Sequence, residues 1–493
     1  MSKIIKIFAL IAFLGIIILT ESCRKDPVFN TDPSFRLEFS NDTIRFDTIF
    51  TSLGSTTLSL KVYNRSNKDI DIRTIQLMGK EASYFRITVD GDTSLFQRNV
   101  RLRAKDSLFI FIRVTIDPNN DANPLAIWDY IRFSYNNRSQ DVVLSAFGQD
   151  AIFHHEIDGY FPYFDGTDTL YIPYTIADCS TPWTAGKPHV MFRYLLVQSG
   201  DELILEAGTR LHFAPDAGLI VDNGGSLKIR GEFGREVVFD GMRMDEAYRN
   251  TTGQWGRIWL FAGSINNEIN WAIIRNGKIG LLVDSMANDD RTLTIENTII
   301  DNMQSHGIWA RNADILGNNL QVSNCGERLL ELVGGRYAFE HCTFANYFRH
   351  LTSFRRTASV LLKNYTYSNS AEISLHPLMR ADFTSCIIYG SRTEGELELD
   401  LKSETTDNYN FSYCNIRTRI NTNSSRFQEC QINIDPFFKN ITPPNFDFDI
   451  AGPPSSQTSG VIGKGKPGSL ISRDLKNRLR PWFSTIGAYE FTE

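Results

Sequence analysis

Short blocks that alternate polar and apolar residues, most of them ending on asparagine, recur along the middle of the chain. They are WAIIRN (271–276), NTIIDN (297–302), NLQVSN (319–324), HCTFAN (341–346) and NYTYSN (364–369), followed by the variants SCIIYG (385–390) and YCNIRT (413–418). The closing asparagines Asn276, Asn302, Asn324, Asn346 and Asn369 are 26, 22, 22 and 23 residues apart. An internal period of this length is typical of architectures built from stacked coils.

Within each block the second and fourth places are nearly always apolar. Alternate residues of an extended strand face opposite ways, so these places predict a shared interior. The pairs are Ala272/Ile274, Thr298/Ile300, Leu320/Val322, Cys342/Phe344, Tyr365/Tyr367, Cys386/Ile388 and Cys414/Ile416. Asparagine tolerates left-handed backbone angles, and its amide can bond to the same residue of the next coil. The sequence therefore predicts a structural ladder of the five asparagines.

Two further short apolar runs follow each block. Runs that start about ten residues after a block begins are GLLVD (280–284), GIWAR (307–311), LLELV (329–333), EISLH (372–376) and ELELD (396–400). Runs that precede the next block are TLTI (292–295), ADIL (313–316), YAFE (337–340), SVLL (359–362) and ADF (381–383). Three short strands per turn of about 22 residues predict an all-β fold, a parallel β-helix with three strands per coil.

The residues before the repeat predict a different domain. Short strands with alternating apolar residues fill 34–150, as in Leu58, Leu60 and Val62, and turns rich in Asn, Asp, Ser and Gly separate them. This spacing indicates a small immunoglobulin-like β-sandwich. We assign residues 23–33 to a tether, 151–190 to an aromatic- and proline-containing connector, and 191–493 to the β-helix.

The repeat resembles the right-handed parallel β-helix superfamily, which includes pectate lyases and many bacterial surface proteins. The stretches GDELILEAGTRLHFAPDAGLIVDNGGSLKIRG (200–231) and RPWFSTIGAYEF (480–491) are similar to the opening and closing segments of β-helix surface lipoproteins. Residues 34–150 resemble immunoglobulin-like domains of the abnormal-spindle/Hydin type. The resemblance implies a fold and a compartment, but the superfamily contains enzymes, adhesins and binding scaffolds, so the activity stays open.

The first residues read as a targeting segment. Lys3 and Lys6 precede an apolar run, residues 7–19, that is too short to span a bilayer in the mature protein. Thr20-Glu21-Ser22-Cys23 resembles a bacterial lipobox, which predicts a signal peptide at 1–22 and lipid attachment at Cys23. The protein would then be held at a membrane of the cell envelope as an outer-membrane lipoprotein, facing either the periplasm or the cell surface. Plain secretion without a lipid and an uncleaved signal anchor are the alternatives.

Composition excludes one class of partner and leaves others open. The net charge is −6 and no long run of Lys or Arg is present, so nucleic acid is not an expected partner. The six cysteines beyond Cys23 have no metal-site spacing, and their pairing is undecided. We expect Cys342, Cys386 and Cys414 to be buried as small apolar residues. His154-His155 lacks a third ligand.

The outward residues of the second run form a candidate ligand face. They include Trp309, Arg311, Glu331, Glu372, His376, Glu396, Glu398 and Asp400, together with Asp284 and Ser374. A tryptophan ring offers a flat apolar surface to a sugar, and the charged groups can bond hydroxyls or hold uronates. An ordinary solvated face is the alternative interpretation.

These features favour a glycan- or surface-binding or structural role. A polysaccharide lyase or glycoside hydrolase acting on an acidic polysaccharide is the alternative, with Asp289-Asp290 and the row Glu396, Glu398 and Asp400 as the acids to test. A bound Ca²⁺ is expected only under the lyase alternative, and no other cofactor or metal is expected. The catalytic residues cannot be named from the sequence, and a purely architectural envelope protein is the third reading.

Overall fold

The computed structural model describes residues 28–492 except 122, 165–167, 247, 349–354, 368–371, 404–406 and 456. The predicted signal peptide, Cys23 and the first residues of the tether therefore lie outside the described residues, as does Asn369. The chain divides into two compact units, residues up to 149 without 120–123, and residues 120–123 with 150–493. Within the described residues, no helix has the length and apolar character needed to cross a membrane.

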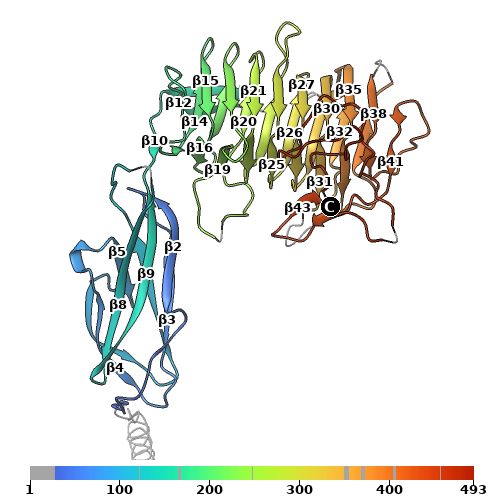
Figure 1. The fold of residues 1–493 in the computed structure, drawn as a ribbon. Coiled ribbons are helices and arrows are strands. Elements are labelled where there is room, and N and C mark those ends of the chain that lie inside the picture. Colours follow the sequence, from blue (N-terminus) through green and yellow to red (C-terminus); the bar gives the residue numbers. More distant parts are fainter. Residues whose placement is uncertain are drawn as a thin grey trace, which may run out of the picture. The chain divides into compact units, whose positions relative to one another are not determined.

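The first unit is a sandwich of two sheets. One sheet has the order β1 (Glu38–Phe39), β3 (Leu58–Tyr63), β7 (Ser107–Val114), β5 (Phe85–Val89). The other has the order β2 (Thr43–Phe50), β9 (Arg138–Gln149), β8 (Leu125–Tyr135), β4 (Ile70–Leu77), β6 (Phe96–Leu102), and a short 3₁₀ turn, η1 (Lys80–Ala82), follows β4 (Figure 1). Alternate residues of each strand, such as Leu60, Ile112 and Phe133, meet in one buried core.

The second unit contains three long sheets whose strands are mostly parallel (Figure 1). Within the described residues, the first sheet has the order β10 (Ile152–His154), β13 (His189–Met191), β16 (Arg210–Phe213), β19 (Val237–Gly241), β22 (Ala272–Arg275), β25 (Ile299–Asp301), β28 (Gln321–Ser323), β31 (Thr343–Asn346), β36 (Ile387–Gly390), β39 (Asn415–Ile416), β41 (Gln431–Ile432).

The second sheet carries the runs in which we expected the ligand face. Its order is β11 (Gly159–Phe164), β12 (Thr169–Ile176), β14 (Tyr194–Val197), β17 (Gly218–Val221), β20 (Ile258–Leu260), β23 (Ile279–Val283), β26 (His306–Arg311), β29 (Arg328–Val333), β32 (Val360–Lys363), β37 (Leu397–Asp400). The strands β11 and β12 are antiparallel, and the following neighbours are parallel.

The third sheet completes each coil. Its order is β15 (Glu202–Glu206), β18 (Ser226–Arg230), β21 (Asn267–Asn270), β24 (Leu293–Glu296), β27 (Asp314–Asn318), β30 (Gly335–Glu340), β35 (Leu378–Thr384), β38 (Tyr409–Ser412), β40 (Phe427–Gln428). The chain visits the first, second and third sheets in turn, which is the right-handed parallel β-helix that the sequence predicts.

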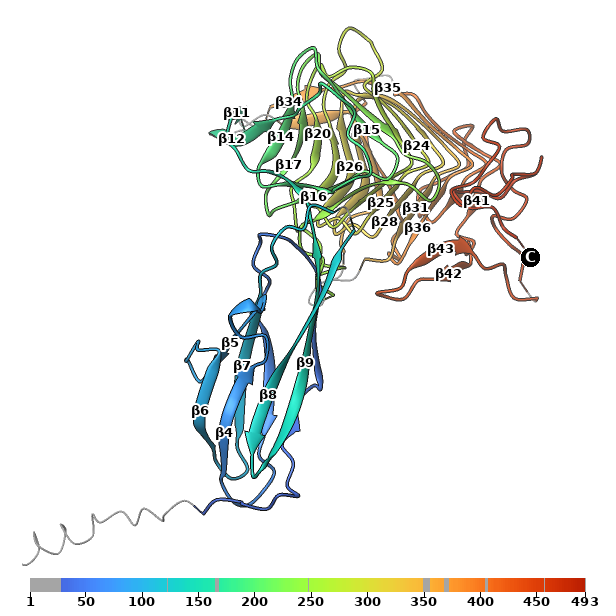
Figure 2. The ribbon, with the colours of Figure 1, turned by 60° about the vertical axis from the view of Figure 1, so that its left-hand side comes forward.

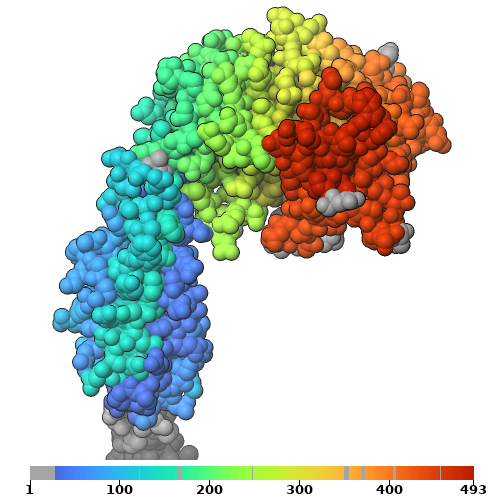
Figure 3. Space-filling view, viewed as in Figure 1, coloured from blue at the N-terminus to red at the C-terminus, as the bar shows by residue number. Residues whose placement is uncertain are grey.

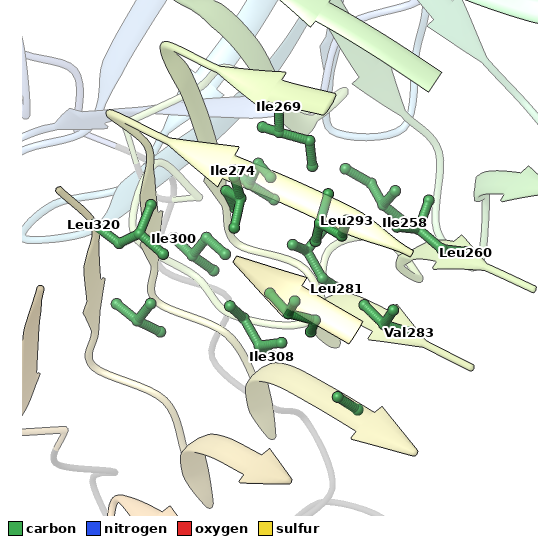
Figure 4. Close-up of a cluster of buried hydrophobic side chains, with 14 of the residues drawn as sticks. Ile258, Leu260, Ile269, Ile274, Leu281, Val283, Leu293, Ile300, Ile308 and Leu320 are labelled. Carbon is green, nitrogen blue, oxygen red and sulfur yellow. The ribbon is translucent and has the colours of Figure 1, made fainter. Parts of the chain in front are cut away.

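One apolar core runs through the coils. Figure 4 shows side chains from all three sheets meeting inside, among them Ile274 and Ile300 of the first sheet, Leu281 and Ile308 of the second, and Leu293 of the third. The second and fourth places of the predicted blocks supply this core in every coil, with exposed fractions of 0–1%, except in the block 364–369. The alternation in the sequence therefore identified the inward residues of six blocks.

The asparagine ladder is present in part. Asn276, Asn302 and Asn324 have φ of 65°, 58° and 49°, and the Asn302 amide donates to Asn276 Oδ1 at 2.7 Å. The Asn324 amide donates instead to Asp301 Oδ1 at 3.2 Å, and that of Asn346 donates to the Cys325 carbonyl at 3.0 Å. A second ladder, which was not predicted from the sequence, lies at the start of the blocks, where Asn319 donates to Asn297 at 2.7 Å and Asn297 donates to Asn270, the residue before its block, at 2.9 Å.

The block 364–369 is not a coil, and this prediction was wrong. Its strand β33 (Tyr365–Tyr367) pairs antiparallel with β34 (Ile373–Leu375), in a hairpin that leaves the three sheets. The run EISLH belongs to this hairpin, and SVLL forms β32 of the second sheet, not a strand of the third. Alternating aromatics and asparagine suit a hairpin as well as a coil, so the pattern could not separate the two.

The ends of the β-helix also differ from the expected boundaries. Residues assigned to a connector supply β10, β11 and β12, which begin the first and second sheets. After β41 the chain folds back over the outer side of the first sheet, with a small hairpin of β42 (Phe438–Asn440) and β43 (Asp447–Ile450). Phe448, Ile486 and Tyr489 pack there on the outward side chains Ile387 and Tyr389. The outer side of the first sheet is thus partly covered, which leaves the second and third sheets as the open faces.

Candidate functional site

A groove of about 760 Å³ lies on the outer side of the second sheet. Its floor comes from successive strands, because parallel pairing in register sets Trp309 beside Glu331, and Arg311 beside Val333. The floor residues are Trp259, Phe261, Ala262, Asp284, Ser285, Trp309, Arg311, Asn312, Glu331, Val333 and Lys363.

Two hairpins supply the walls of the groove. Pro162, Tyr163 and Phe164 come from β11, and Tyr365, Thr366, Tyr367 and His376 come from the β33–β34 hairpin. Figure 2 shows β11, β12 and β34 on the side of the β-helix that carries β14, β20 and β26. The rings of Phe164 and Tyr367 are 61% and 58% exposed, so both walls present an aromatic surface to solvent.

Asp284 organises one end of the floor. Arg311 bonds its Oδ1 through Nε at 2.7 Å and through Nη2 at 2.5 Å, and the Trp259 indole donates to its Oδ2 at 2.8 Å. Both carboxylate oxygens therefore have partners, and the guanidinium is held in one orientation. The Arg311 guanidinium carbon also lies 5.6 Å from the centre of the Trp309 ring.

Glu331 organises the middle of the floor. Its Oε2 lies 3.2 Å from His306 Nε2 and 3.5 Å from Arg328 Nε, and the His306 ring stacks on Trp309 at 5.1 Å. Burial alone would raise the pKa of Glu331, but the hydrogen bond from His306 and the charges of Arg328 and Lys363 lower that pKa below its usual value. Glu331 is therefore an ionised carboxylate at neutral pH.

His376 ties the second hairpin to the floor. Its Nδ1 lies 3.1 Å from the Asn312 amide nitrogen, and its Nε2 lies 2.8 Å from the Thr366 hydroxyl. Burial lowers the pKa of this imidazole, which is neutral at pH 7. Because the Asn312 amide donates to Nδ1, the proton is on Nε2 and is donated to Thr366. Both ring nitrogens of His376 thus hold the β33–β34 wall of the groove against its floor.

The far end of the groove carries a cation beside two tyrosines. Lys363 Nζ lies 4.4 Å from the ring centre of Tyr365 and 5.8 Å from that of Tyr367. The Tyr365 hydroxyl donates to Asp400 Oδ2 at 2.6 Å. Among the described residues, no carboxylate oxygen lies within 4.0 Å of this ammonium group, which leaves it available to a ligand.

The structure gathers four of the eight predicted face residues in the groove. They are Trp309, Arg311, Glu331 and His376. Glu398 and Asp400 lie just outside it, where they bond Arg328 at 2.8 Å and Tyr365 at 2.6 Å. Glu372 is an exposed residue that immediately precedes β34 and does not line the groove.

Glu396 does not belong to the face, and its assignment there was wrong. Its side chain is fully buried and paired with Arg355 at 2.7 Å, and it also accepts from the Ser359 hydroxyl at 2.6 Å. Strand β37 begins one residue later, at Leu397, so the alternation of the strand does not apply to Glu396. Its position next to a glycine, Gly395 with φ of 108°, is the local signal of a turn.

The two aromatic walls of the groove could not be predicted from the sequence. Alternation identifies which residues of a coil point outward, but it does not show that Tyr365 and Tyr367 leave the coil. Nor does it place the aromatics of β11 beside the face, because the aromatic- and proline-containing residues 151–190 show no regular alternation that would predict strands of the β-helix. The dense aromatic composition of FPYF (161–164) was the one available signal.

The third sheet carries smaller and more polar hollows, of about 430, 410 and 570 Å³. The first is lined mainly by amides, hydroxyls and charged groups, such as Asn318, Asp382 and Asn410. Asp289 and Asp290 line the largest, where Asp289 lies 3.6 Å from Arg336. In the part of the chain that the structure describes, no group of three or more His, Cys, Asp or Glu side chains is arranged to hold a metal ion.

The buried thiols, and the two neighbouring histidines His154 and His189, are packed inside the protein. Cys342, Cys386 and Cys414 are free and fully buried, and burial raises the pKa of Cys386 and Cys414 well above the usual value. His154 Nε2 lies 3.0 Å from His189 Nδ1, and burial lowers the pKa of these two rings to about 4 and about 3. Such groups are poor nucleophiles and weak bases at neutral pH.

Comparisons with known proteins give distant structural likenesses. No protein-family model matches the chain, and no curated protein matches it in sequence. The catalytic unit of a thermostable GH87 alpha-1,3-glucanase from Streptomyces thermodiastaticus strain HF3-3 is 9% identical, with 76% of this chain and 88% of that chain covered and a TM-score of 0.27.

Two other likenesses cover a smaller part of this chain. The human CEP192 ASH/PapD-like domain 7 is 14% identical, over 27% of this chain and 95% of that one, at a TM-score of 0.17. Vibrio cholerae VesB protease is 13% identical over 23% of this chain, with a TM-score of 0.17, and the match spans 31% of the protease. At these scores the likenesses carry no argument about activity, which has to come from the groove itself.

Proposed function

We propose that the second unit is a glycan-binding scaffold and that the groove on the second sheet holds the glycan. One observation carries the proposal: aromatic side chains from two hairpins stand on either side of a floor of fixed hydrogen-bonding groups. Flat aromatic rings cover the apolar faces of sugars, and oriented polar groups bond their hydroxyls. Trp309, Phe164 and Tyr367 supply the aromatic rings. Arg311, Glu331 and Lys363 supply the polar groups.

The state of the carboxylates favours binding over turnover. A general acid for glycoside cleavage needs a raised pKa so that it holds a proton at working pH. The pKa of Glu331 is lowered instead, and Asp284 has both oxygens engaged by Arg311 and Trp259. Groups held in this way orient a ligand without supplying a proton.

A glycan panel followed by calorimetry tests the proposal. The full chain should bind at least one oligosaccharide without consuming it, and Trp309→Ala should weaken the affinity by on the order of thirtyfold, as for a central aromatic contact. Asn410→Ala, on the third sheet, is the matched control and should leave the affinity unchanged. Equal affinities in the wild type and Trp309→Ala would remove the groove from consideration.

A glycoside hydrolase is the second candidate, because two carboxylates line the same groove. Asp284 and Glu331 are two coils apart, which puts their backbone positions on the order of 10 Å from one another. Release of reducing ends that disappears in Asp284→Asn and in Glu331→Gln would establish this activity. A lyase would instead release unsaturated ends, lose activity in Glu398→Ala and Asp400→Ala, and respond to Ca²⁺. A purely architectural protein would bind no glycan and show neither activity.

The proposed place of action is the cell envelope. The support is in the sequence alone: the positive and apolar first residues followed by the lipobox-like Thr20-Glu21-Ser22-Cys23. We propose lipid attachment at Cys23 and retention at the outer membrane. Mass spectrometry of the N-terminal peptide should show an acylated Cys23, and Cys23→Ser should release the protein from the membrane fraction. Protease treatment of intact cells then distinguishes the cell surface from the periplasmic face.

A further inference from the structure

The last residues of the chain form a two-sided layer, which we call the closing segment (residues 461–492). Its inner side is apolar and covers the first sheet through residues such as Val461, Ile486 and Tyr489. The Tyr489 hydroxyl donates to Gln321 at 2.5 Å and the Ala488 amide to Thr343 at 2.9 Å, so the segment is firmly docked. Figure 3 shows the C-terminal residues, in red, gathered on one face of the β-helix unit.

The outer side of the closing segment exposes large apolar side chains. Leu470, Leu479, Trp482 and Phe483 have exposed fractions of 97%, 68%, 68% and 62%. Four such residues within fourteen positions are unusual for a solvated surface. They lie close together in space, because two runs of the segment are side by side.

The pairing of these two runs is fixed by backbone bonds. The Gly465 amide donates to the Ser484 carbonyl at 2.8 Å, and the Arg480 amide to the Ser472 carbonyl at 2.9 Å. Gly468 lies against the Trp482 ring, where an added Cβ would come within 2.8 Å of the ring. Glycine at 468, with φ of 70°, thus lets the chain pass under the ring and leaves its other face open.

The unpaired charges of the closing segment itself have one sign, and the nearby acids belong to the third sheet: Glu340 accepts from the Ser469 hydroxyl at 2.7 Å, and Asp382 lines the same hollow as Lys466. Lys464, Lys466 and Arg473 are exposed, and among the described residues no carboxylate oxygen lies within 4.0 Å of their cationic groups. The described acids of the segment, Asp474 and Glu490, are buried and bonded to Arg478 and Arg480. The outer side of the closing segment therefore combines tryptophan, phenylalanine and leucine with three cations that form no ion pair among the described residues.

We propose that the closing segment is a membrane-contact surface for a bilayer that contains anionic phospholipid. Tryptophan and phenylalanine partition to the headgroup boundary, leucine enters the acyl region, and lysine and arginine bond the phosphates. A nucleic acid would use the aromatic rings and the cations, but it offers nothing to Leu470 and Leu479. This contact is separate from the groove and does not depend on it.

Fluorescence quenching in vesicles tests the contact at a defined residue. The full chain is mixed with vesicles of brominated phosphatidylcholine, with or without 30% phosphatidylserine, and the tryptophan emission is compared among variants. The chain has seven tryptophans, so the contribution of one is obtained by difference. Trp482→Phe removes the proposed contact residue, and Trp128→Phe is the matched control, since Trp128 is 64% exposed in the first unit.

We expect bromolipid quenching of the wild type and of Trp128→Phe, and a clear loss of that quenching in Trp482→Phe. The triple change Lys464→Gln, Lys466→Gln and Arg473→Gln should weaken binding to the vesicles that contain phosphatidylserine by on the order of fivefold per cation. Equal quenching in the wild type and Trp482→Phe would overturn the proposal, even if the apolar first residues of the chain bind to the same vesicles. If the emission assigned to Trp482 by difference is the same with and without every kind of vesicle, the membrane proposal is also overturned and a protein partner is favoured.

Discussion

The outer faces of the second and third sheets are built by the same coils and differ in what surrounds them. Both carry polar residues in register, such as Arg311, Lys363 and Asp400 on the second sheet and Asn318, Glu340 and Thr384 on the third. On the third sheet they line smaller, more polar hollows of about 410–570 Å³. On the second sheet two hairpins turn the same kind of floor into a groove of about 760 Å³ with aromatic walls.

The difference shows that the repeat supplies a floor and that its interruptions supply a site. The β11–β12 hairpin precedes the regular coils, and the β33–β34 hairpin replaces what would have been another one. A stacked coil holds outward residues about 4.8 Å apart in rows, which positions polar groups well but leaves them open to water. Aromatic side chains that stand above the floor have to come from segments outside the repeat.

The largest expected effect is on stability, and it distinguishes the buried Glu396, just before β37, from the partly exposed Glu398 within β37. Glu396→Ala leaves the buried Arg355 cation without a partner, and it should lower the free energy of unfolding by about 3–5 kcal/mol. Glu398→Ala breaks a pair whose carboxylate is 45% exposed, and it should cost about 0–1 kcal/mol. Thermal unfolding of both variants measures the difference. Equal losses would mean that Glu396 is on the surface, as the sequence alone suggested.

The walls should matter more for binding than any residue of the third sheet. Phe164→Ala together with Tyr367→Ala removes the two exposed wall rings, and glycan affinity should fall on the order of tenfold or more. Gln428→Ala, in a hollow of the third sheet, should change the affinity less than twofold by the same calorimetry. A comparable loss in Gln428→Ala would erase the distinction between the two faces.

The asparagine ladder lies at the turn from the first sheet to the second and lines neither the groove nor the hollows, so breaking it should lower stability without changing glycan affinity. Asn302→Ala loses the bond to Asn276 and strains a residue with φ of 58°, which should cost about 1–2 kcal/mol. Asn302→Gly keeps the backbone angle and should cost less. Chemical unfolding gives both values, and glycan affinity measured on the same samples should stay that of the wild type. A larger loss in the glycine variant than in the alanine variant would show that backbone angle is not the cause.

The smallest effect is a pH dependence that arises on the first sheet, away from both open faces. Burial raises the pKa of Asp301 from 3.8 to about 6, although Ser323 and Asn324 donate hydrogen bonds to it. The folded state therefore holds this proton more tightly than the unfolded state, and the stability contributed by the protonated group is lost as pH rises from about 4 to about 6. Asp301→Asn removes the titration and should have the higher Tm at pH 7.5.

The same pair of proteins supplies the control at low pH. At pH 3.5, just below the unfolded-state pKa of 3.8, Asp301 is mostly protonated in both states, so the Tm difference between the wild type and Asp301→Asn should shrink towards zero. A difference that stays constant between pH 3.5 and 7.5 would show that this carboxyl does not titrate in that range.

The sequence predicted the coils because they obey a simple physical rule. Alternation of side chains along a strand, repeated at a fixed period, requires inward apolar residues such as Ile274, Ile300 and Val322 at equivalent places. The β33–β34 pair was not predicted because Tyr365 and Tyr367 alternate with polar residues too, and the block spacing stays at 22 to 23 residues there. Pairing partner, parallel or antiparallel, is a long-range property that local alternation does not contain.

In the candidate site, only the residues on regular strands could be predicted from the sequence. Trp309, Arg311 and Glu331 lie on regular strands, so their outward direction followed from the register. Glu396 precedes its strand, and its buried partner Arg355 is 41 residues away in the sequence. The contribution of Phe164 to the groove depends on stacking of coils that are far apart in the chain, which no local pattern reveals.

Hydrogen–deuterium exchange of the full chain, with and without a bound oligosaccharide from the panel, tests the central claim most directly. A glycan held between the two hairpins should slow exchange in residues 159–164, 365–367 and 373–376, which belong to β11, β33 and the β34 wall. Residues 378–384 and 409–412 of the third sheet should exchange at the same rate in both samples. Protection confined to 378–384 and 409–412 would place the ligand on the third sheet and contradict the account.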